Sequence, residues 1–208
     1  MKNILAVIAH PDDLELMAGG SIIKWLAEGK NVHVLTFTHG SWKSPSGTLI
    51  RSIEESLIEE ENVAKFIGYK CENLKEETLS LNFKDKYVSE ILLRVEKYNI
   101  DTLLCPFKGD LHHDHEVVSR LTLSASRRVP NLLMGQINYY LGEFFTPNIF
   151  VDITKTWDKK INALKMYEGQ WSRAGNDWFD YQDSTTRYYG KIIGVERAEG
   201  FYSNKIMI

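Results

Sequence analysis

Short apolar runs alternate with longer segments of helical periodicity along this 208-residue chain. Residues 4–9 form a continuous apolar run, which is typical of a parallel strand covered by helices on both faces. Residues 31–38 and 102–105 predict two further strands. Apolar side chains at helical spacing follow these strands, and two such segments end at Gly29 and Gly68, as helices often do. Because the connections are too long for hairpins, the sequence predicts an α/β fold with an open, mostly parallel sheet.

The remaining patterns extend this alternation. Ser52 and Glu55 have the spacing of a capping box, which predicts that a helix begins there and continues to Gly68. Thr154 is expected to cap a later helix. No repeat and no change of composition marks a boundary, so residues 1–208 are predicted to form a single Rossmann-like domain with helices on both faces of the sheet. Further helices are expected at residues 87–97, 113–125 and 154–167. Further strands are expected at residues 136–140 and 148–153.

Composition narrows the possible partners. The chain has 25 Lys and Arg residues against 28 Asp and Glu residues, so it lacks the excess of positive charge that attracts nucleic acid or anionic membranes. The apolar run at residues 4–9 is far too short to span a bilayer. Two cysteines, Cys71 and Cys105, argue against a disulfide scaffold and fit a reducing cytoplasm. We therefore expect a cytoplasmic protein with a small-molecule partner, no nucleic acid and no membrane insertion.

Two polar segments each follow directly after a predicted strand. The first is Ala9-His10-Pro11-Asp12-Asp13-Leu14-Glu15, and the second, about a hundred positions later, is Asp110-Leu111-His112-His113-Asp114-His115. Ligands of open α/β sheets bind beyond the carboxyl ends of the strands, so both segments are expected at one edge of the sheet. A dication is the simplest reason to collect so many carboxylates and imidazoles. Two imidazoles and one carboxylate form a common catalytic zinc set, which leaves other carboxylates and imidazoles for proton transfer.

Simpler explanations exist for single members of these segments. An acid-rich helix start stabilises a helix without any ligand, because acidic side chains favour helix N-termini. His33 and His39 are more simply ordinary surface or core residues, and His113 is interpreted as an exposed position. His39 begins a polar loop of residues 39–48 that is long enough for binding, so a substrate contact by His39 stays open.

At these residues the sequence resembles the PIG-L family of metal-dependent deacetylases, also called LmbE-like proteins. The resemblance implies that His10, Asp13 and His115 bind zinc. It also implies that Asp12 is the general base and that His112 stabilises or protonates the tetrahedral intermediate. Asp114 is expected to orient an imidazole, as metal-bound and catalytic histidines generally require.

The reaction implied by this resemblance is amide hydrolysis of an N-acetylamino sugar of the N-acetylglucosamine type, free or conjugated, which releases acetate and a free amine. Arg51 is a possible substrate contact. Aromatic side chains could stack on a sugar, although such residues are more often core or oligomer contacts; they are Trp42, Trp171, Trp178, Tyr181, Tyr188 and Tyr189. The turn after the first strand lacks the glycine fingerprint of dinucleotide binding.

Two other functions remain open at this point. The same two-histidine, one-carboxylate set binds Fe(II) in non-haem oxygenases, although those sites usually lie on a β jelly roll. A non-catalytic protein that binds a sugar or a metal is the other alternative. The sequence leaves the substrate, the choice between Zn²⁺ and Fe²⁺ and the oligomeric state open, and a homo-oligomer is possible.

Overall fold

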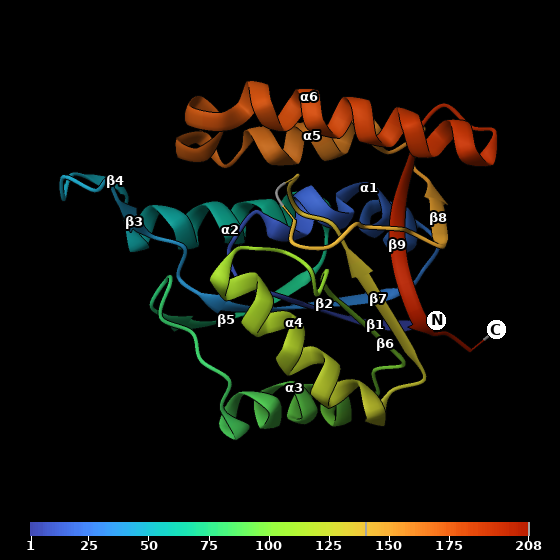
Figure 1. Ribbon diagram of the computed structural model, residues 1–208, viewed down its shortest axis with the longest axis horizontal. Helices are drawn as coiled ribbons and strands as arrows, with labels where there is room; N and C mark the ends of the chain where they lie inside the picture. The colour runs from blue at the N-terminus through green and yellow to red at the C-terminus, as the bar shows by residue number, and fades with distance from the viewer. Residues whose placement is uncertain (140, 208) are drawn as a thin grey trace.

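The computed structural model describes residues 1–139 and 141–207 (Figure 1). Its centre is a seven-stranded sheet with the strand order β5-β2-β1-β6-β7-β9-β8. The strands are parallel except at β9, which runs antiparallel to both of its neighbours. In the order of the sheet, their bounds are Lys70–Glu76, Asn31–Thr38, Asn3–Ile8, Thr102–Pro106, Asn131–Gly135, Ala198–Lys205 and Ile149–Asp152. A separate hairpin joins β3 (Trp42–Lys43) to β4 (Leu49–Arg51).

Helices cover both faces of the sheet, as Figure 1 shows. One face carries α3 (Asp85–Lys97) and α4 (His113–Ala125), which is followed by the short 3-10 helix η1 (Ser126–Arg128). The other face carries α1 (Asp13–Ala27) and α2 (Ile53–Ile67), with α5 (Trp157–Lys165) and α6 (Glu168–Ile193) packed outside them. The predicted Rossmann-like α/β architecture is thereby confirmed.

The position of β1 in the middle of the sheet explains why its sequence is apolar without interruption. Ile4, Ala6 and Ile8 belong to the core under α1, whereas Leu5 and Val7 belong to the core under α4. Successive side chains of a strand point to opposite faces, so a strand with two covered faces needs apolar residues at every position. Packing on both faces therefore fixes β1 up to Ile8, just before the polar loop that contains His10.

Several local predictions agree with the structure. The strand at residues 31–38 matches β2, and Ser52 and Glu55 form the predicted capping box at the start of α2. Gly68 ends that helix with φ 110°, a conformation that glycine adopts without a steric penalty. The predicted loop at residues 39–48 holds the start of the β3–β4 hairpin.

Two predictions in the second half of the chain are wrong, and one predicted helix is shorter than expected. The strand expected at residues 136–140 lies earlier, as β7, where Asn131–Gly135 pairs in parallel with β6; residues 136–139 have no strand structure, and position 140 lies outside the described residues. Thr154 does not cap α5, since its N–H donates to Asp152 and Thr156 precedes the helix. The helix predicted at residues 154–167 is α5, which covers only Trp157–Lys165. Most of the C-terminal stretch, for which the sequence predicted no element, forms α6 and β9.

A buried ion pair fixes α1 against the C-terminal elements. The Nζ atom of Lys160 lies 2.6 Å from Oε1 of Glu199 and donates to the carbonyl oxygen of Leu16 at 3.1 Å. The Glu199 carboxylate also accepts from the backbone N–H groups of Gly20 and Ser21. Because every charged atom of this pair is hydrogen-bonded, the pair can be buried, and it holds the helix that begins at the polar loop after β1.

Within residues 1–139 and 141–207, the helices are all too short or too polar to cross a membrane. Cys71 and Cys105 are both free thiols.

Candidate metal centre

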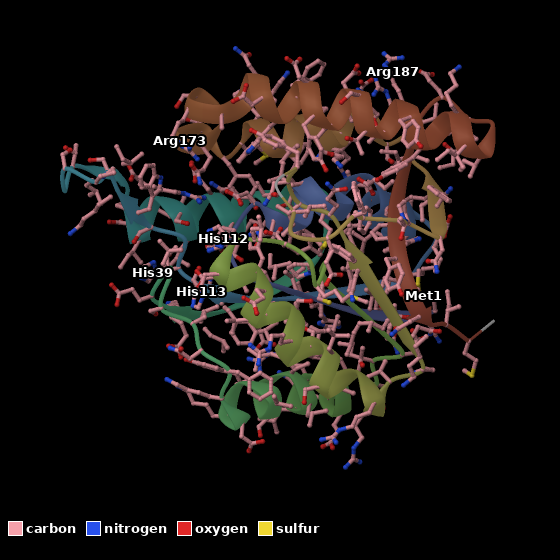
Figure 2. All side chains as sticks on the ribbon, in the orientation of Figure 1. Met1, His39, His112, His113, Arg173 and Arg187 are labelled. Carbon is pink, nitrogen blue, oxygen red and sulfur yellow. The ribbon has the colours of Figure 1, made fainter. Side chains whose placement is uncertain are left out.

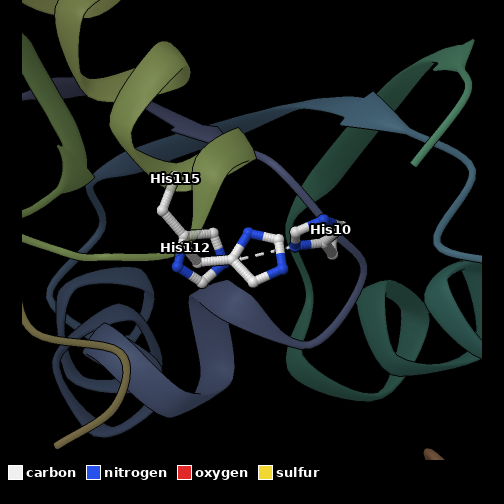
Figure 3. Close-up of side chains that lie close together, drawn as sticks. All are labelled: His10, His112 and His115. Carbon is white, nitrogen blue, oxygen red and sulfur yellow. Dashed lines mark hydrogen bonds between the residues drawn. The ribbon is translucent and has the colours of Figure 1, made fainter. Parts of the chain in front are cut away.

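The loops that follow β1 and β6 bring three imidazoles together. His10 lies in the loop after β1, whereas His112 and His115 lie at the start of α4, and Figure 3 shows the three rings next to one another. One nitrogen from each ring lies within 4.8 Å of the others, so this cluster could hold a metal ion. The two loops meet because β1 and β6 are adjacent parallel strands.

Asp13 adds a carboxylate to this cluster with a spacing that suits a metal. The distance from His10 Nδ1 to His115 Nε2 is 3.2 Å, and Asp13 Oδ1 lies 3.2 Å from His115 Nε2. Asp13 Oδ2 lies 3.5 Å from His10 Nδ1. With metal–ligand bonds of about 2.0–2.1 Å, the ligand atoms of a tetrahedral zinc site are about 3.3 Å apart. The His10–His115 and Asp13–His115 distances therefore match the spacing of ligand atoms in such a site, and Asp13 approaches His10 through its other carboxylate oxygen.

The other ring nitrogens of these two histidines contact carboxylates. Nε2 of His10 lies 3.0 Å from Oδ2 of Asp114, and Nδ1 of His115 lies 2.9 Å from Oδ2 of Asp110. Both carboxylates are buried. Carboxylates in this position orient metal-binding imidazoles and make them more basic. They also leave His10 Nδ1 and His115 Nε2 as the nitrogens that face the shared centre.

The charges around this centre favour a cation. Burial lowers the pKa of His10, but Asp13 and Asp114 raise it more, to about 9. Burial likewise lowers the pKa of His115, but Asp13 and Asp110 raise it to about 10. Burial raises the pKa of Asp13, yet the two imidazoles hold it well below its usual range. A bound dication would supply the same positive charge to these buried carboxylates.

We expect the substitutions Asp110→Asn and Asp114→Asn each to weaken metal binding about 10–100-fold, because each removes the carboxylate that orients one candidate ligand. Competition with a chromophoric chelator measures the dissociation constant. Glu116→Gln is the matched control, since this exposed side chain lies on the same helix and pairs with Arg120 instead. Wild-type affinity in both Asp variants would show that these carboxylates do not support a metal site.

Asp12 lies beside the cluster in a strained conformation. It precedes α1 with φ 106°, which few residues other than glycine adopt, and it is 5% exposed. Its Oδ2 atom lies 3.6 Å from Nη1 of Arg51 and 3.5 Å from Nε2 of Gln170. Burial raises the pKa of Asp12 to about 7, although Arg51 opposes this shift. A carboxylate with a pKa near neutrality is suited to accept a proton during a reaction.

His112 is oriented by the backbone of its own helix. Its Nδ1 accepts the N–H of Asp114 at 3.3 Å, so the neutral ring carries its proton on Nε2. Burial and the neighbouring His115 and His10 lower the pKa of His112 to about 4, which keeps the ring neutral. A neutral imidazole with this tautomer presents one N–H donor to the cavity.

The two predicted substrate contacts differ in their placement. Arg51 lines the cavity, where Nε and Nη2 donate to Oε2 of Glu59 and Nη1 has no hydrogen-bond partner among the described residues. His39 is outside the cavity lining, and its Nδ1 accepts the N–H of Ser41. Figure 2 shows His39 near the edge of the molecule. The structure thus brings Arg51, but not His39, to the metal centre.

The cavity in front of the cluster has a volume of about 320 Å³. Part of its wall comes from α6, which contributes Gln170, Arg173 and Trp178. No motif in the sequence points to these positions, since α6 has only scattered aromatic and polar residues. Of the aromatic residues considered for sugar stacking, Trp42 and Trp178 line the cavity, whereas Trp171 packs beside the core. The contact of Asp110 with His115 could have been inferred from the sequence, because Asp110 begins the second polar segment, five positions before His115.

The fold and this centre together define an α/β protein with a buried cluster of imidazoles and carboxylates that could hold a metal ion. The family model PIG-L, described as GlcNAc-PI de-N-acetylase, matches residues 5–126. The chain belongs to this family of deacetylases. This result confirms the resemblance seen in the two polar segments.

Individual relatives extend the match over nearly the whole chain. The diacetylchitobiose deacetylase of Thermococcus kodakarensis is 27% identical over 96% of this chain and 82% of its own. A conserved protein from Thermus thermophilus, TT1542, has a TM-score of 0.85 at 25% identity, covering 100% of this chain and 97% of its own. The N,N′-diacetylchitobiose deacetylase from Pyrococcus horikoshii has a TM-score of 0.82 at 21% identity, covering 98% and 84%.

The same fold also occurs in an enzyme of another class. The 4-carboxy-2-hydroxymuconate hydratase GalB from Pseudomonas putida has a TM-score of 0.80 at 19% identity, covering 100% of this chain and 98% of its own. The fold alone therefore does not decide the reaction, and the side chains of the site must.

Proposed function

We propose that this protein is a zinc-dependent hydrolase that removes the acetyl group from an N-acetylamino sugar or its conjugate. The observation that carries the proposal is the placement of Asp12 and His112 on one cavity with the His10, Asp13 and His115 triangle. Family membership and the deacetylase activity named for the diacetylchitobiose relatives support the substrate class. A cytoplasmic location is part of the proposal, supported by two free thiols.

In this proposal His10, Asp13 and His115 hold the metal, with one position left for water or substrate. Zinc suits two imidazoles and one carboxylate, and Fe²⁺ suits them as well. His112 is the alternative third ligand, since its ring belongs to the same cluster. We favour Asp13 because its Oδ1 lies 3.2 Å from the nitrogen of His115 that faces the centre.

The chain's own residues divide the proton transfers of amide hydrolysis. When bound, the metal would acidify water and polarise the acyl oxygen. Asp12 accepts the proton of the attacking water; Arg51 and Gln170 both approach its Oδ2, which leaves Oδ1 to act as the base. His112 donates its Nε2–H to the oxygen on which negative charge develops. The proton taken up by Asp12 then passes to the nitrogen as the C–N bond breaks, so the products are acetate and a free amino sugar.

We expect the zinc-loaded protein to release acetate and an equal amount of free amine from N,N′-diacetylchitobiose or N-acetylglucosamine. Enzymatic acetate determination and an amine-reactive dye measure the two products. Protein stripped of metal by a chelator is the control and should be inactive until zinc is restored. Oxygen consumption with Fe²⁺ and an α-keto acid, without acetate release, would instead support the oxygenase alternative. Sugar binding without any turnover would support the non-catalytic one.

A further inference from the structure

We infer that the mouth of the cavity is a subsite for an anionic substituent, a carboxylate or a phosphate, on the amino-sugar substrate. The subsite consists of Trp42 from the β3–β4 hairpin and the exposed Arg173 from the first turns of α6. The buried Arg51, at the end of that hairpin, lies between this subsite and Asp12 in the cavity lining. The inference rests on the proposed function, because it concerns the part of the same substrate that lies away from its acetamide.

Arg173 is a cation held in place without a countercharge. Its Nε and Nη2 atoms donate to Oε1 of Gln170 at 3.3 and 2.9 Å, and its guanidinium lies 5.4 Å from the centre of the Trp42 ring. Within residues 1–139 and 141–207, Arg173 forms no ion pair with a carboxylate. Figure 2 shows it at the end of α6 that lies on the same side of the molecule as His112. Because a neutral amide and an aromatic ring orient it, the guanidinium is prepared for an anion that the chain does not supply.

The neighbouring groups of the mouth are also donors. The Nε1 atom of Trp42 is buried and has no hydrogen-bond partner among the described residues. The Nη1 atom of Arg51 faces Oδ2 of Asp12 at 3.6 Å, beyond hydrogen-bond distance, and has no closer acceptor there. Arg173 covers one face of Trp42, so that face cannot stack on a sugar. Donors without acceptors favour a ligand with several acceptor oxygens, and guanidinium groups bind carboxylates and phosphates with two parallel hydrogen bonds.

The charge of the cavity leads to the same conclusion. At the candidate metal centre a bound dication would face the carboxylates of Asp13, Asp110 and Asp114. Arg51 is paired with Glu59 and Asp12. Arg173 is thus a lining cation without a carboxylate partner in the described part of the chain, and it would draw an anionic substituent to its side of the cavity.

The test compares the turnover of a neutral substrate with that of substrates that carry an anionic group. The neutral substrate and its closest anionic counterpart are the methyl and carboxymethyl β-glycosides of N-acetylglucosamine; N-acetylglucosamine 1-phosphate and 6-phosphate distinguish a phosphate subsite from a carboxylate subsite. We expect at least one anionic substrate to have a kcat/KM about tenfold higher than the methyl glycoside, mainly through a lower KM. The preference should decrease with ionic strength.

Variants assign this preference to Arg173. Arg173→Ala should lower the ratio of anionic to neutral kcat/KM at least tenfold, and Arg173→Lys should retain part of the ratio, because lysine keeps the charge but not the planar fork. Arg187→Ala is the matched control: Arg187 lies on the same helix, outside the cavity lining, and is paired with Asp183. A ratio cancels a general loss of active protein, so a partly misfolded variant still gives a valid comparison.

Two results would overturn the subsite: a wild-type ratio of one or less for all anionic substrates, or a ratio that Arg173→Ala leaves unchanged. Turnover of the methyl glycoside in that case would leave the proposed deacetylation intact. If no sugar is turned over, the proposed function fails, and calorimetric dissociation constants of the two glycosides still decide the subsite. Equal constants would reject it, and tighter binding of the carboxymethyl glycoside that Arg173→Ala abolishes would support it.

Discussion

Asp12→Asn should reduce kcat at least about a hundredfold while the metal content stays at the wild-type value, since a positioned general base contributes about 10²–10⁴-fold. Asparagine removes the basic oxygen but keeps the size of the side chain. It also tolerates positive φ better than alanine does, which matters because Asp12 has φ 106°. The loss should therefore reflect chemistry rather than a rearranged loop.

Initial rates of acetate release and the zinc content of the same samples measure this prediction. Asp85→Asn is the matched control, because Asp85 is an exposed carboxylate at the start of α3 on the opposite face of the sheet. Thermal unfolding of both variants reports whether the fold is intact. Wild-type turnover by Asp12→Asn would remove Asp12 from the mechanism, whereas loss of zinc would mean that Asp12 belongs to the metal site.

The second large effect is expected for the three proposed metal ligands. His115→Ala and Asp13→Ala should each weaken metal binding by more than the 10–100-fold expected for the carboxylates behind them, and turnover should be lost with the metal. His115 contributes Nε2 to the centre, and Asp13 contributes a carboxylate oxygen 3.2 Å away. Atomic emission spectrometry after dialysis measures the bound metal.

His112→Ala separates the two possible ligand sets. If Asp13 is the third ligand, this variant should keep its metal and lose turnover through the missing donor. Retention of metal by Asp13→Ala together with its loss from His112→Ala would establish the three-imidazole set instead. His113→Ala is the control within the same segment, because its exposed ring bonds to the carbonyl oxygen of Leu81 and should affect neither property. Near-UV circular dichroism verifies the fold of each variant.

The parts of the fold that could be predicted are those with a strong local pattern. The β1 and β2 strands, the capping box of α2 and the ends of α1 and α2 depend on residues within a few positions of one another. The β7 strand was not placed from its own residues, because Asn131–Gly135 is defined by its pairing with β6. The α6 helix was not assigned because most of its buried positions carry small or polar side chains; they are Gly175, Gln182, Thr186, Tyr189 and Gly190.

The sequence by itself determined that two histidine- and carboxylate-rich segments follow strands of a parallel sheet, and hence that they lie at the same edge of it. That conclusion needs only the period of the strands and the direction of parallel pairing. That they meet depends on the pairing of β1 with β6, which the structure decided. Only the tertiary structure decided which nitrogen of His10 and of His115 faces the centre, since Asp114 and Asp110 choose it across the site. The structure also brought Gln170 and Arg173 to the cavity that Asp12 lines, although Asp12 lies more than 150 positions earlier in the chain. Such contacts arise from the packing of α6 over the sheet, and no local spacing in a sequence encodes that packing.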